Sequence, residues 1–429
     1  MECVRVQVLL VFMHCLAMGS QVCDSDNMQD CQEELTNRAC PTASTKPRID
    51  EEPQQWQTIK DRSVIVFSAY IDRRIIAGGP AVRIIASGLQ EQFHEIGHLH
   101  CQLWFDHLNE AISVGPAEYI RIYPSTLHPD MWVSHFIMCP LPRYAPSAPF
   151  AISITPGSCD ETAENLLKVL DPTDEAKESN SFALCVSPVY NNFQDWLMVI
   201  EWFEIHKLIG SNEITIYNLS ASPHTNKVLE FYAQSSDFQV NVVPWKFPPK
   251  LQSNVWCQRA ALNDCLYRMG MKHSHVAITD LDEILVPRGY ETWKDLIQGI
   301  DKPHRGAYLF QHAYFRRNHT SSEDPYLITQ QSLWRTSEVT PPGKIRCKSM
   351  YKASKAVKID LHFPYELIAG SEEYILPPAE GMLHHYRQEP METFRKHPER
   401  FTFIEDEFMK KHEHALKERV NKVKLHIGL

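Results

Sequence analysis

The stretch His275-Val-Ala-Ile-Thr-Asp-Leu-Asp-Glu-Ile-Leu-Val-Pro287 sets an apolar run directly before an acidic cluster. Its first five residues are typical of a buried strand. Asp280 and Asp282 follow at once, and their spacing of two residues puts both carboxylates on one side of extended backbone. A second apolar run, 284–287, then continues the strand. The sequence therefore predicts two acidic side chains at the end of a buried strand.

Strand-like runs alternate with amphipathic helical patterns on the N-terminal side of this stretch. Apolar residues fall on one helical face over 196–208, and a further helix is expected over roughly 254–269. The expected strands are short, apolar runs at 182–186, 214–217 and 240–243. Repeated β-α-β units predict an α/β fold with a mostly parallel, helix-covered sheet. Ligands bind such sheets beyond the carboxyl ends of the strands, where Asp280 and Asp282 would lie.

The pair Asp280 and Asp282 has the chemistry of a divalent-cation site. Hard carboxylate oxygens suit Mn²⁺ or Mg²⁺, and such a cation can bridge the two phosphates of a nucleotide sugar. Breaking a sugar–phosphate bond releases a nucleoside diphosphate, whose developing charge the cation would neutralise. An isolated Asp-x-Asp after a strand is more often a solvated turn. Its place at the end of a βα unit favours the metal interpretation here.

The chain divides into several predicted parts. Residues 6–18 are mostly apolar and follow Arg5, but they are shorter than the roughly 20 residues of a comfortable membrane span. They are expected to form either a cleaved signal peptide or a short uncleaved signal-anchor. The predicted boundaries are 1–22 for this signal, 23–59 for a polar stem, 60–180 for a smaller β-rich domain, 181–400 for the α/β domain and 401–429 for a charged C-terminal helix.

The cysteines and the net charge indicate the cellular compartment and exclude some partners. Ten of the twelve cysteines follow the apolar segment and none forms a C-x-x-C pair, so disulfides in an oxidising compartment are expected rather than zinc. Asn218 and Asn318 begin glycosylation triplets, which fits a luminal protein. With 53 acidic against 43 basic residues, the formal charge of -10 argues against a nucleic-acid partner. A local basic run, 344–358, could meet phosphate, although most such runs are solvated.

Several segments in order resemble glycosyltransferase family 92. They are Phe67-Ser-Ala-Tyr with Asp72-Arg73, Cys185-Val-Ser-Pro, Glu201-Trp-Phe-Glu-Ile-His-Lys-Leu-Ile-Gly, Gln258-Arg-Ala-Ala-Leu-Asn-Asp-Cys-Leu-Tyr-Arg268, Asp280-Leu-Asp-Glu-Ile-Leu-Val-Pro, Lys348-Ser and His384-His-Tyr-Arg387. The resemblance implies a GT-A (Rossmann-like) domain over 181–400 with inverting, metal-dependent transfer. It also implies galactose from UDP-galactose as donor, a glycan or glycoprotein acceptor, and a single-pass type II Golgi membrane protein with a luminal catalytic domain. A secreted form is the alternative if the N-terminal segment is cleaved.

Candidate roles for individual residues come from this resemblance and from their positions at strand ends and on the helix expected over 254–269. The metal candidates are Asp280, Asp282, His384 and His385, with Asp282 as the main ligand and a late histidine completing the shell. The nucleotide-sugar candidates are Ser187, Tyr190, Asp264, Asp280 and Lys348. The alternative for a single histidine is a hydrogen-bonded core residue, and Asp264 could instead only solvate its helix.

The catalytic base is the least constrained assignment. Inversion needs a carboxylate within hydrogen-bond reach of the acceptor hydroxyl. Glu323 and Asp324, in the loop after Arg316-Arg-Asn-His-Thr, are the candidates, although surface-loop acids usually have no such role. Trp334 and Tyr314 are candidates for stacking on an acceptor sugar, against the commoner role of core packing.

Two other functions are compatible with these features. One is a luminal carbohydrate-binding protein that keeps the fold without turnover. The other is a glycoside hydrolase, but its two carboxylates would stand roughly 5–9.5 Å apart across a sugar, which the closely spaced Asp280 and Asp282 do not suggest.

Overall fold

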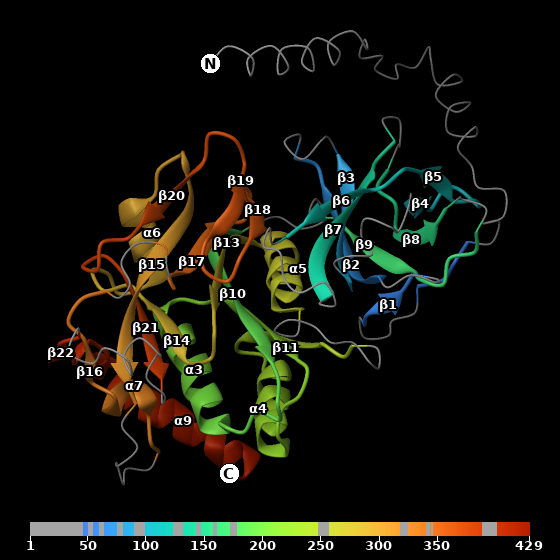
Figure 1. The fold of residues 1–429 in the computed structure, drawn as a ribbon. Coiled ribbons are helices and arrows are strands. Elements are labelled where there is room, and N and C mark those ends of the chain that lie inside the picture. The colour runs from blue at the N-terminus through green and yellow to red at the C-terminus, as the bar shows by residue number, and fades with distance from the viewer. Residues whose placement is uncertain are drawn as a thin grey trace, which may run out of the picture.

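The computed structural model describes two large β-sheets with helix α5 between them, while the other helices lie around the second sheet (Figure 1). The described residues are 46–49, 55–59, 64–74, 80–89, 99–122, 132–142, 147–157, 161–171, 178–247, 257–317, 325–339, 344, 346–387 and 401–429. The predicted signal and most of the predicted stem lie outside them. Within them, no helix is both long and apolar enough to cross a membrane.

The N-terminal sheet has the strand order β5-β4-β8-β9-β2-β3-β7-β6, and β1 pairs with β2. Its strands are β1 (Gln57–Thr58), β2 (Val64–Asp72), β3 (Ala81–Leu89), β4 (Leu99–Trp104), β5 (Ile112–Val114), β6 (Glu118–Arg121), β7 (Trp132–Pro140), β8 (Ala151–Pro156) and β9 (Leu167–Leu170). A disulfide joins Cys101 of β4 to Cys139 of β7, whose Cα atoms are 6.0 Å apart. Because β4 and β7 lie near opposite ends of the strand order, the sheet folds back on itself around an apolar interior.

The second sheet has the strand order β12-β11-β10-β13-β17-β15-β16-β22. Its strands, with β14, β20 and β21 attached, are β10 (Glu178–Val189), β11 (Glu213–Asn218), β12 (Gln239–Pro244), β13 (His273–Thr279), β14 (Glu283–Val286), β15 (Arg305–Arg316), β16 (Trp334–Thr336), β17 (Lys348–Lys352), β20 (Glu372–Ile375), β21 (Met382–Arg387) and β22 (Phe403–Glu405). A separate ribbon pairs β18 (Ala356–Ile359) with β19 (Pro364–Leu367).

The expected α/β organisation is confirmed, but the sheet is mixed rather than mostly parallel. The block β12-β11-β10-β13 is parallel, as helical crossovers require. Strand β17 enters from later in the chain between β13 and β15 and is antiparallel to both. Strand β15 then pairs in parallel with β20 and β21. The alternation of strands and helices could not predict β17, because its neighbours in the sheet are distant in sequence.

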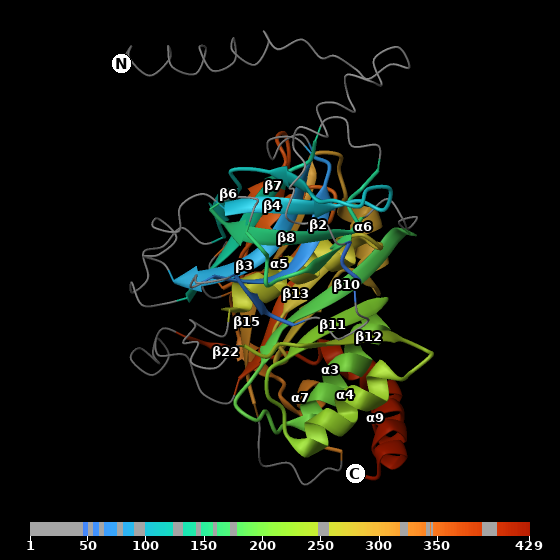
Figure 2. The ribbon, with the colours of Figure 1, turned by 90° about the vertical axis from the view of Figure 1, so that its right-hand side faces the viewer.

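Helices cover the second sheet on both faces. They are α3 (Trp196–Ile209), α4 (Pro223–Ala233), α5 (Gln258–Gly270), α6 (Trp293–Ile300), the short α7 (Ile328–Gln331) and α9 (Glu413–Ile427). Side chains of β10 alternate between the two faces: Phe182 and Leu184 pack with α3, α4 and α6, while Ala183 and Cys185 pack with α5. Figure 2 shows α3, α4 and α9 stacked together. The C-terminal helix therefore belongs to the α/β core.

Helix α5 lies between the two sheets, and none of its side chains is exposed. It contacts β2, β3 and β7 of the N-terminal sheet and β10 and β13 of the second sheet. Its apolar side chains share one core cluster with Phe67 and Phe136 of the N-terminal strands. A disulfide between Cys265 of α5 and Cys185 of β10 ties the helix to the second sheet. The expected disulfides are thus confirmed for four cysteines, whereas the described Cys347 is a buried free thiol.

Candidate active site

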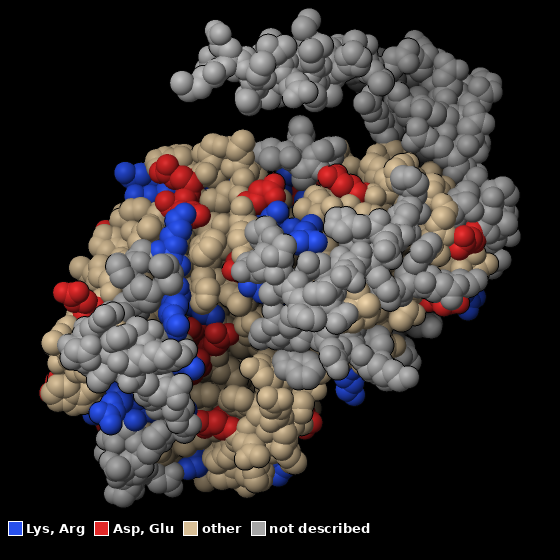
Figure 3. All heavy atoms as spheres, in the orientation of Figure 1, with Lys and Arg blue, Asp and Glu red and all other residues tan. Residues whose placement is uncertain are grey.

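A cleft of about 1030 Å³ opens at the carboxyl ends of β10 and β13. Its lining comes from the segment after β10, the first turn of α3, the segment 280–282, and the ends of β15 and β21. Figure 3 shows a hollow on this face, with acidic side chains inside it and basic side chains along its edge. The cleft is large enough for a nucleotide-sized ligand, since small-molecule pockets run to roughly 300–1,000 Å³.

The acidic segment forms a tight turn between β13 and β14. The amide of Glu283 donates to the carbonyl of Asp280 at 3.1 Å, and the amide of Asp280 donates back to the carboxylate of Glu283 at 3.0 Å. Glu283 is itself buried as the first residue of β14. The two interactions fix the direction of the carboxylates that follow β13.

Lys348 neutralises this turn from the adjacent strand β17. Its Nζ lies 2.6 Å from Asp280 Oδ2 and 3.0 Å from Glu283 Oε2, and its side chain is 2% exposed. Burial alone would raise the pKa of Asp280, but the Lys348 ammonium and the Ser187 hydroxyl lower it to about 2. Burial is the largest effect on Glu283 and raises its pKa. Lys348 was expected to contact the nucleotide sugar, but its ammonium group instead forms ion pairs with the carboxylates of Asp280 and Glu283.

Asp282 and His385 meet in the cleft. His385 Nε2 lies 3.2 Å from Asp282 Oδ2, because β14 and β21 pair with Glu283 opposite His385. Burial would lower the pKa of His385, yet Asp282 and Glu283 raise it. The other ring nitrogen of His385, Nδ1, is 3.0 Å from Nε2 of the buried His312 on β15. This contact fixes the orientation of the His385 ring.

His384 lies on the opposite face of β21 and does not join this cluster. Its ring is fully buried, stacks on Phe315 and has Nε2 3.1 Å from a guanidinium nitrogen of Arg288. Burial and the Arg288 charge lower its pKa well below the usual value, so the ring is neutral. Of the two candidate histidines, only His385 faces the cleft acids. Within the described residues, no three His, Cys, Asp or Glu side chains are already grouped around a metal position.

Arg288 and Arg335 hold the carboxylate of Asp406 beside His384, each at 2.6 Å. Burial would raise the pKa of Asp406, but these two guanidiniums lower it from 3.8 to about 2. Because the pKa of Asp406 is lower in the folded protein than in the unfolded chain, its ionised carboxylate stabilises the folded protein above pH 3.8. This stabilisation is lost as the pH falls toward 2 and the carboxylate is protonated. We expect the difference in unfolding free energy between wild type and Asp406→Asn to shrink by about 2 kcal/mol from pH 4 to pH 2, measured by urea denaturation. A difference that is independent of pH would contradict this assignment.

The remaining cleft residues surround the acidic turn. Ser187 accepts a hydrogen bond from the Gln258 side chain, and Tyr190 lies 39% exposed on the wall, so both nucleotide-sugar candidates line the cleft. Two basic side chains that were not predicted also line it, Arg317 and Arg387. Arg317 donates to Asp195, the N-cap of α3, at 3.0 Å.

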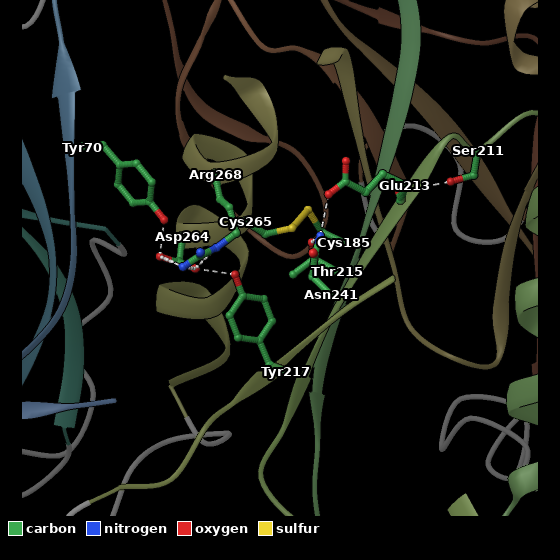
Figure 4. Close-up of a disulfide and its surroundings, with 10 residues drawn as sticks. All are labelled: Tyr70, Cys185, Ser211, Glu213, Thr215, Tyr217, Asn241, Asp264, Cys265 and Arg268. Atoms are coloured by element: carbon green, nitrogen blue, oxygen red, sulfur yellow. Dashed lines mark hydrogen bonds and ion pairs between the residues drawn. A yellow bond between two sulfur atoms is a disulfide. The ribbon is translucent and has the colours of Figure 1, made fainter. Parts of the chain in front are cut away.

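Asp264 lies outside this cleft, between the two sheets (Figure 4). Its fully buried carboxylate accepts hydrogen bonds from Tyr70 at 2.6 Å and Tyr217 at 2.5 Å, and also from Ser68. Arg268 lies 3.1 Å from the same carboxylate. Burial raises the pKa of both tyrosines well above 10, so both phenols keep the protons that they donate. These contacts join β2, β11 and α5 and account for the polarity of Asp264 without a ligand.

We expect Asp264→Asn to lower the unfolding free energy by about 3 kcal/mol, because it leaves the half-buried charge of Arg268 without its partner. The Michaelis constant for the nucleotide-sugar donor should not change. Chemical denaturation and donor kinetics measure the two effects. Asp237→Asn, at an exposed position, is the matched control and should change stability by less than about 0.5 kcal/mol. If Asp264→Asn raised the Michaelis constant for the donor without changing the unfolding free energy, the structural role would be wrong and Asp264 would belong to the donor site.

Three candidates, Glu323, Asp324 and Asn318, lie outside the described residues. The other glycosylation candidate, Asn218, ends β11 and is only partly exposed. Its side-chain amide donates to Asn226 at 2.9 Å, a contact that glycosylation of this nitrogen would disturb.

Comparisons with known proteins relate this chain to one family. Residues 180–423 match the family described as Glycosyltransferase family 92. Two Caenorhabditis elegans proteins bearing that family name are 22% identical over 32% of this chain and 24% identical over 44% of it. Those alignments cover 29% and 39% of the relatives, so the chain spans less than half the length of either.

Among solved structures, a mannosyltransferase from Pyrobaculum calidifontis in complex with GDP-Man and Mn²⁺ is similar over 58% of this chain and 75% of its own. The TM-score is 0.30 and the sequence identity 12%.

Proposed function

The chain belongs to glycosyltransferase family 92, and we propose that it is a metal-dependent, inverting hexosyltransferase of the GT-A type. The proposed donor is UDP-galactose and the proposed acceptor a glycan or glycoprotein. The observation that carries the proposal is the meeting of Asp282 and His385 in a nucleotide-sized cleft beyond the strand ends. Donor and acceptor identity rest on the family resemblance described above.

The residues in the cleft fit a divalent cation with few protein ligands. Asp282 Oδ2 and His385 Nε2, 3.2 Å apart, are a carboxylate and an imidazole donor, both of which Mn²⁺ accepts. Mg²⁺ and Mn²⁺ sites that handle phosphates commonly use one or two protein ligands, with water and phosphate oxygens as the rest. Asp280 is already paired with Lys348, so we assign Asp282 and His385 as the ligands. When bound, the cation would neutralise the charge that develops on the diphosphate leaving group.

The chain's own residues supply the remaining functions. Lys348 holds Asp280 ionised and oriented beside Ser187, which suits hydrogen bonding to the ribose. Arg317 and Arg387 bring positive charge to the cleft wall, where they favour a diphosphate. The attacking acceptor hydroxyl needs a base, and Glu323 or Asp324 remains the prediction for that role.

We propose a luminal Golgi location, with the N-terminal segment as signal-anchor. The two disulfides among the described residues support an oxidising compartment.

A donor screen tests the proposed function. Purified protein is incubated with each common nucleotide sugar and with Mn²⁺ or a chelator, and both transfer to a glycan array and hydrolysis to water are followed. We expect metal-dependent turnover of UDP-galactose above all other donors. Folded protein that neither binds Mn²⁺ nor turns over any donor would instead favour the carbohydrate-binding alternative.

A further inference from the structure

Trp334 is the most exposed aromatic side chain of the described residues, at 53%. It begins β16, near the carboxyl end of β15. Tyr314, the other aromatic candidate for sugar stacking, is 2% exposed and packs against Phe403, so it belongs to the core. The two aromatic residues therefore have different roles, and the exposure of Trp334 needs its own explanation.

The strand pairing connects Trp334 to the cleft. Arg387 lines the cleft and pairs with Arg316 of β15. Phe315 of β15 pairs with Arg335 of β16 in antiparallel register. Arg316, the next residue of β15, therefore lies opposite Trp334, the preceding residue of β16. Both side chains are on the face of the sheet that Phe315 and Arg335 do not occupy. Trp334 in turn pairs with Glu405 of β22. Arg387, Arg316, Trp334 and Glu405 thus form one row across four strands, which we name the acceptor shelf.

We propose that the acceptor shelf binds the oligosaccharide that receives the sugar. This inference rests on the proposed function, because the shelf begins in the cleft assigned to the donor. An acceptor must approach the donor from a surface that adjoins the cleft. The row from Arg387 to Glu405 supplies such a surface and extends it outward by the width of several strands, each roughly 4.8 Å.

The side chains of the shelf match the chemistry of a sugar. A pyranose ring has a face of C–H groups that packs on an indole, and Trp334 offers an exposed indole. Its hydroxyls can accept from guanidinium groups and donate to a carboxylate, here Arg316, Arg387 and Glu405. No carboxylate of the described part of the chain forms an ion pair with either arginine.

The test separates acceptor binding from donor chemistry. Wild-type protein and the Trp334→Ala variant are bound to a printed array of N-glycan, O-glycan and glycolipid oligosaccharides, and UDP-galactose hydrolysis to water is measured in parallel. We expect Trp334→Ala to lose roughly tenfold or more in affinity for the glycans that wild type binds. Its hydrolysis rate and melting temperature should match wild type. Trp334→Phe should restore part of the affinity.

Ile404→Ala is the matched control. Ile404 is 41% exposed on the same strand as Glu405 but on the other face, opposite Arg335. It should leave glycan binding unchanged. Equal losses in both variants, array binding that is insensitive to Trp334→Ala, or no array binding by wild type would overturn the shelf. So would a change in oligomeric state caused by Trp334→Ala. Glycan binding that depends on Trp334 in a protein that turns over no donor, with or without an acceptor glycan, would show a glycan-binding shelf but overturn its role as an acceptor site.

Discussion

The Asp282→Asn protein should lose transferase activity by roughly a hundredfold or more while remaining folded. The substitution removes a ligand charge from the proposed metal site but keeps the shape of the side chain. Asp282 is 32% exposed and contacts His385, so its replacement does not open the core. Transfer assays across a Mn²⁺ titration, together with thermal melting, measure the effect.

The Mn²⁺ titration discriminates between loss of metal and loss of fold. Weaker metal binding shifts the Mn²⁺ dependence to higher concentration without lowering the melting temperature. His385→Gln should shift it in the same direction, because His385 is the second assigned ligand. Asp237→Asn controls for the loss of one surface charge. Full Mn²⁺-stimulated transfer by Asp282→Asn would refute the site.

The Lys348→Met protein should be less stable by about 3 kcal/mol, because it leaves the buried Glu283 and the partly exposed Asp280 without a cation. Wild-type Lys348 Nζ touches both carboxylates within 3.0 Å. With this cation absent, the turn that aims Asp282 loses its anchor, so activity should fall as well. Urea denaturation and donor kinetics report the two losses.

Lys344→Met is the matched control on the segment that precedes β17. Lys344 is 50% exposed and pairs with Glu373 at the surface, where an ion pair contributes roughly 0–1 kcal/mol. Its loss should be small. If Lys348→Met were as stable as Lys344→Met, the proposed coupling between β17 and the acidic turn would be wrong.

The acidic turn was accessible from sequence because its geometry is local. An apolar run followed by Asp280 and Asp282 predicts a strand end with two carboxylates, and both residues line the cleft. Ser187 lies near the end of β10 and Tyr190 directly after it, at the same edge of the sheet. These predictions needed only the period of a strand and the rule that ligands lie beyond strand ends.

The other assignments depended on partners that are distant in sequence. His384 and His385 differ only in which face of β21 they occupy, and the pairing of β21 with β14 decides that. Asp264 required knowledge that α5 faces the N-terminal sheet. The roles of Arg387 and His312 depend on the pairing of β15 with β21, which brings together residues that are about 70 positions apart in sequence.

The burial of α5 between two sheets bears on how this protein could have evolved. The family match begins at residue 180, after the N-terminal sheet has ended. A gene fragment that starts there would expose the side of α5 that packs on Phe67 and Phe136, and would leave Asp264 without Tyr70. The N-terminal sheet is therefore not a module that recombination could remove or exchange freely. Any replacement would have to supply both an apolar cover for α5 and hydroxyl donors to its buried carboxylate.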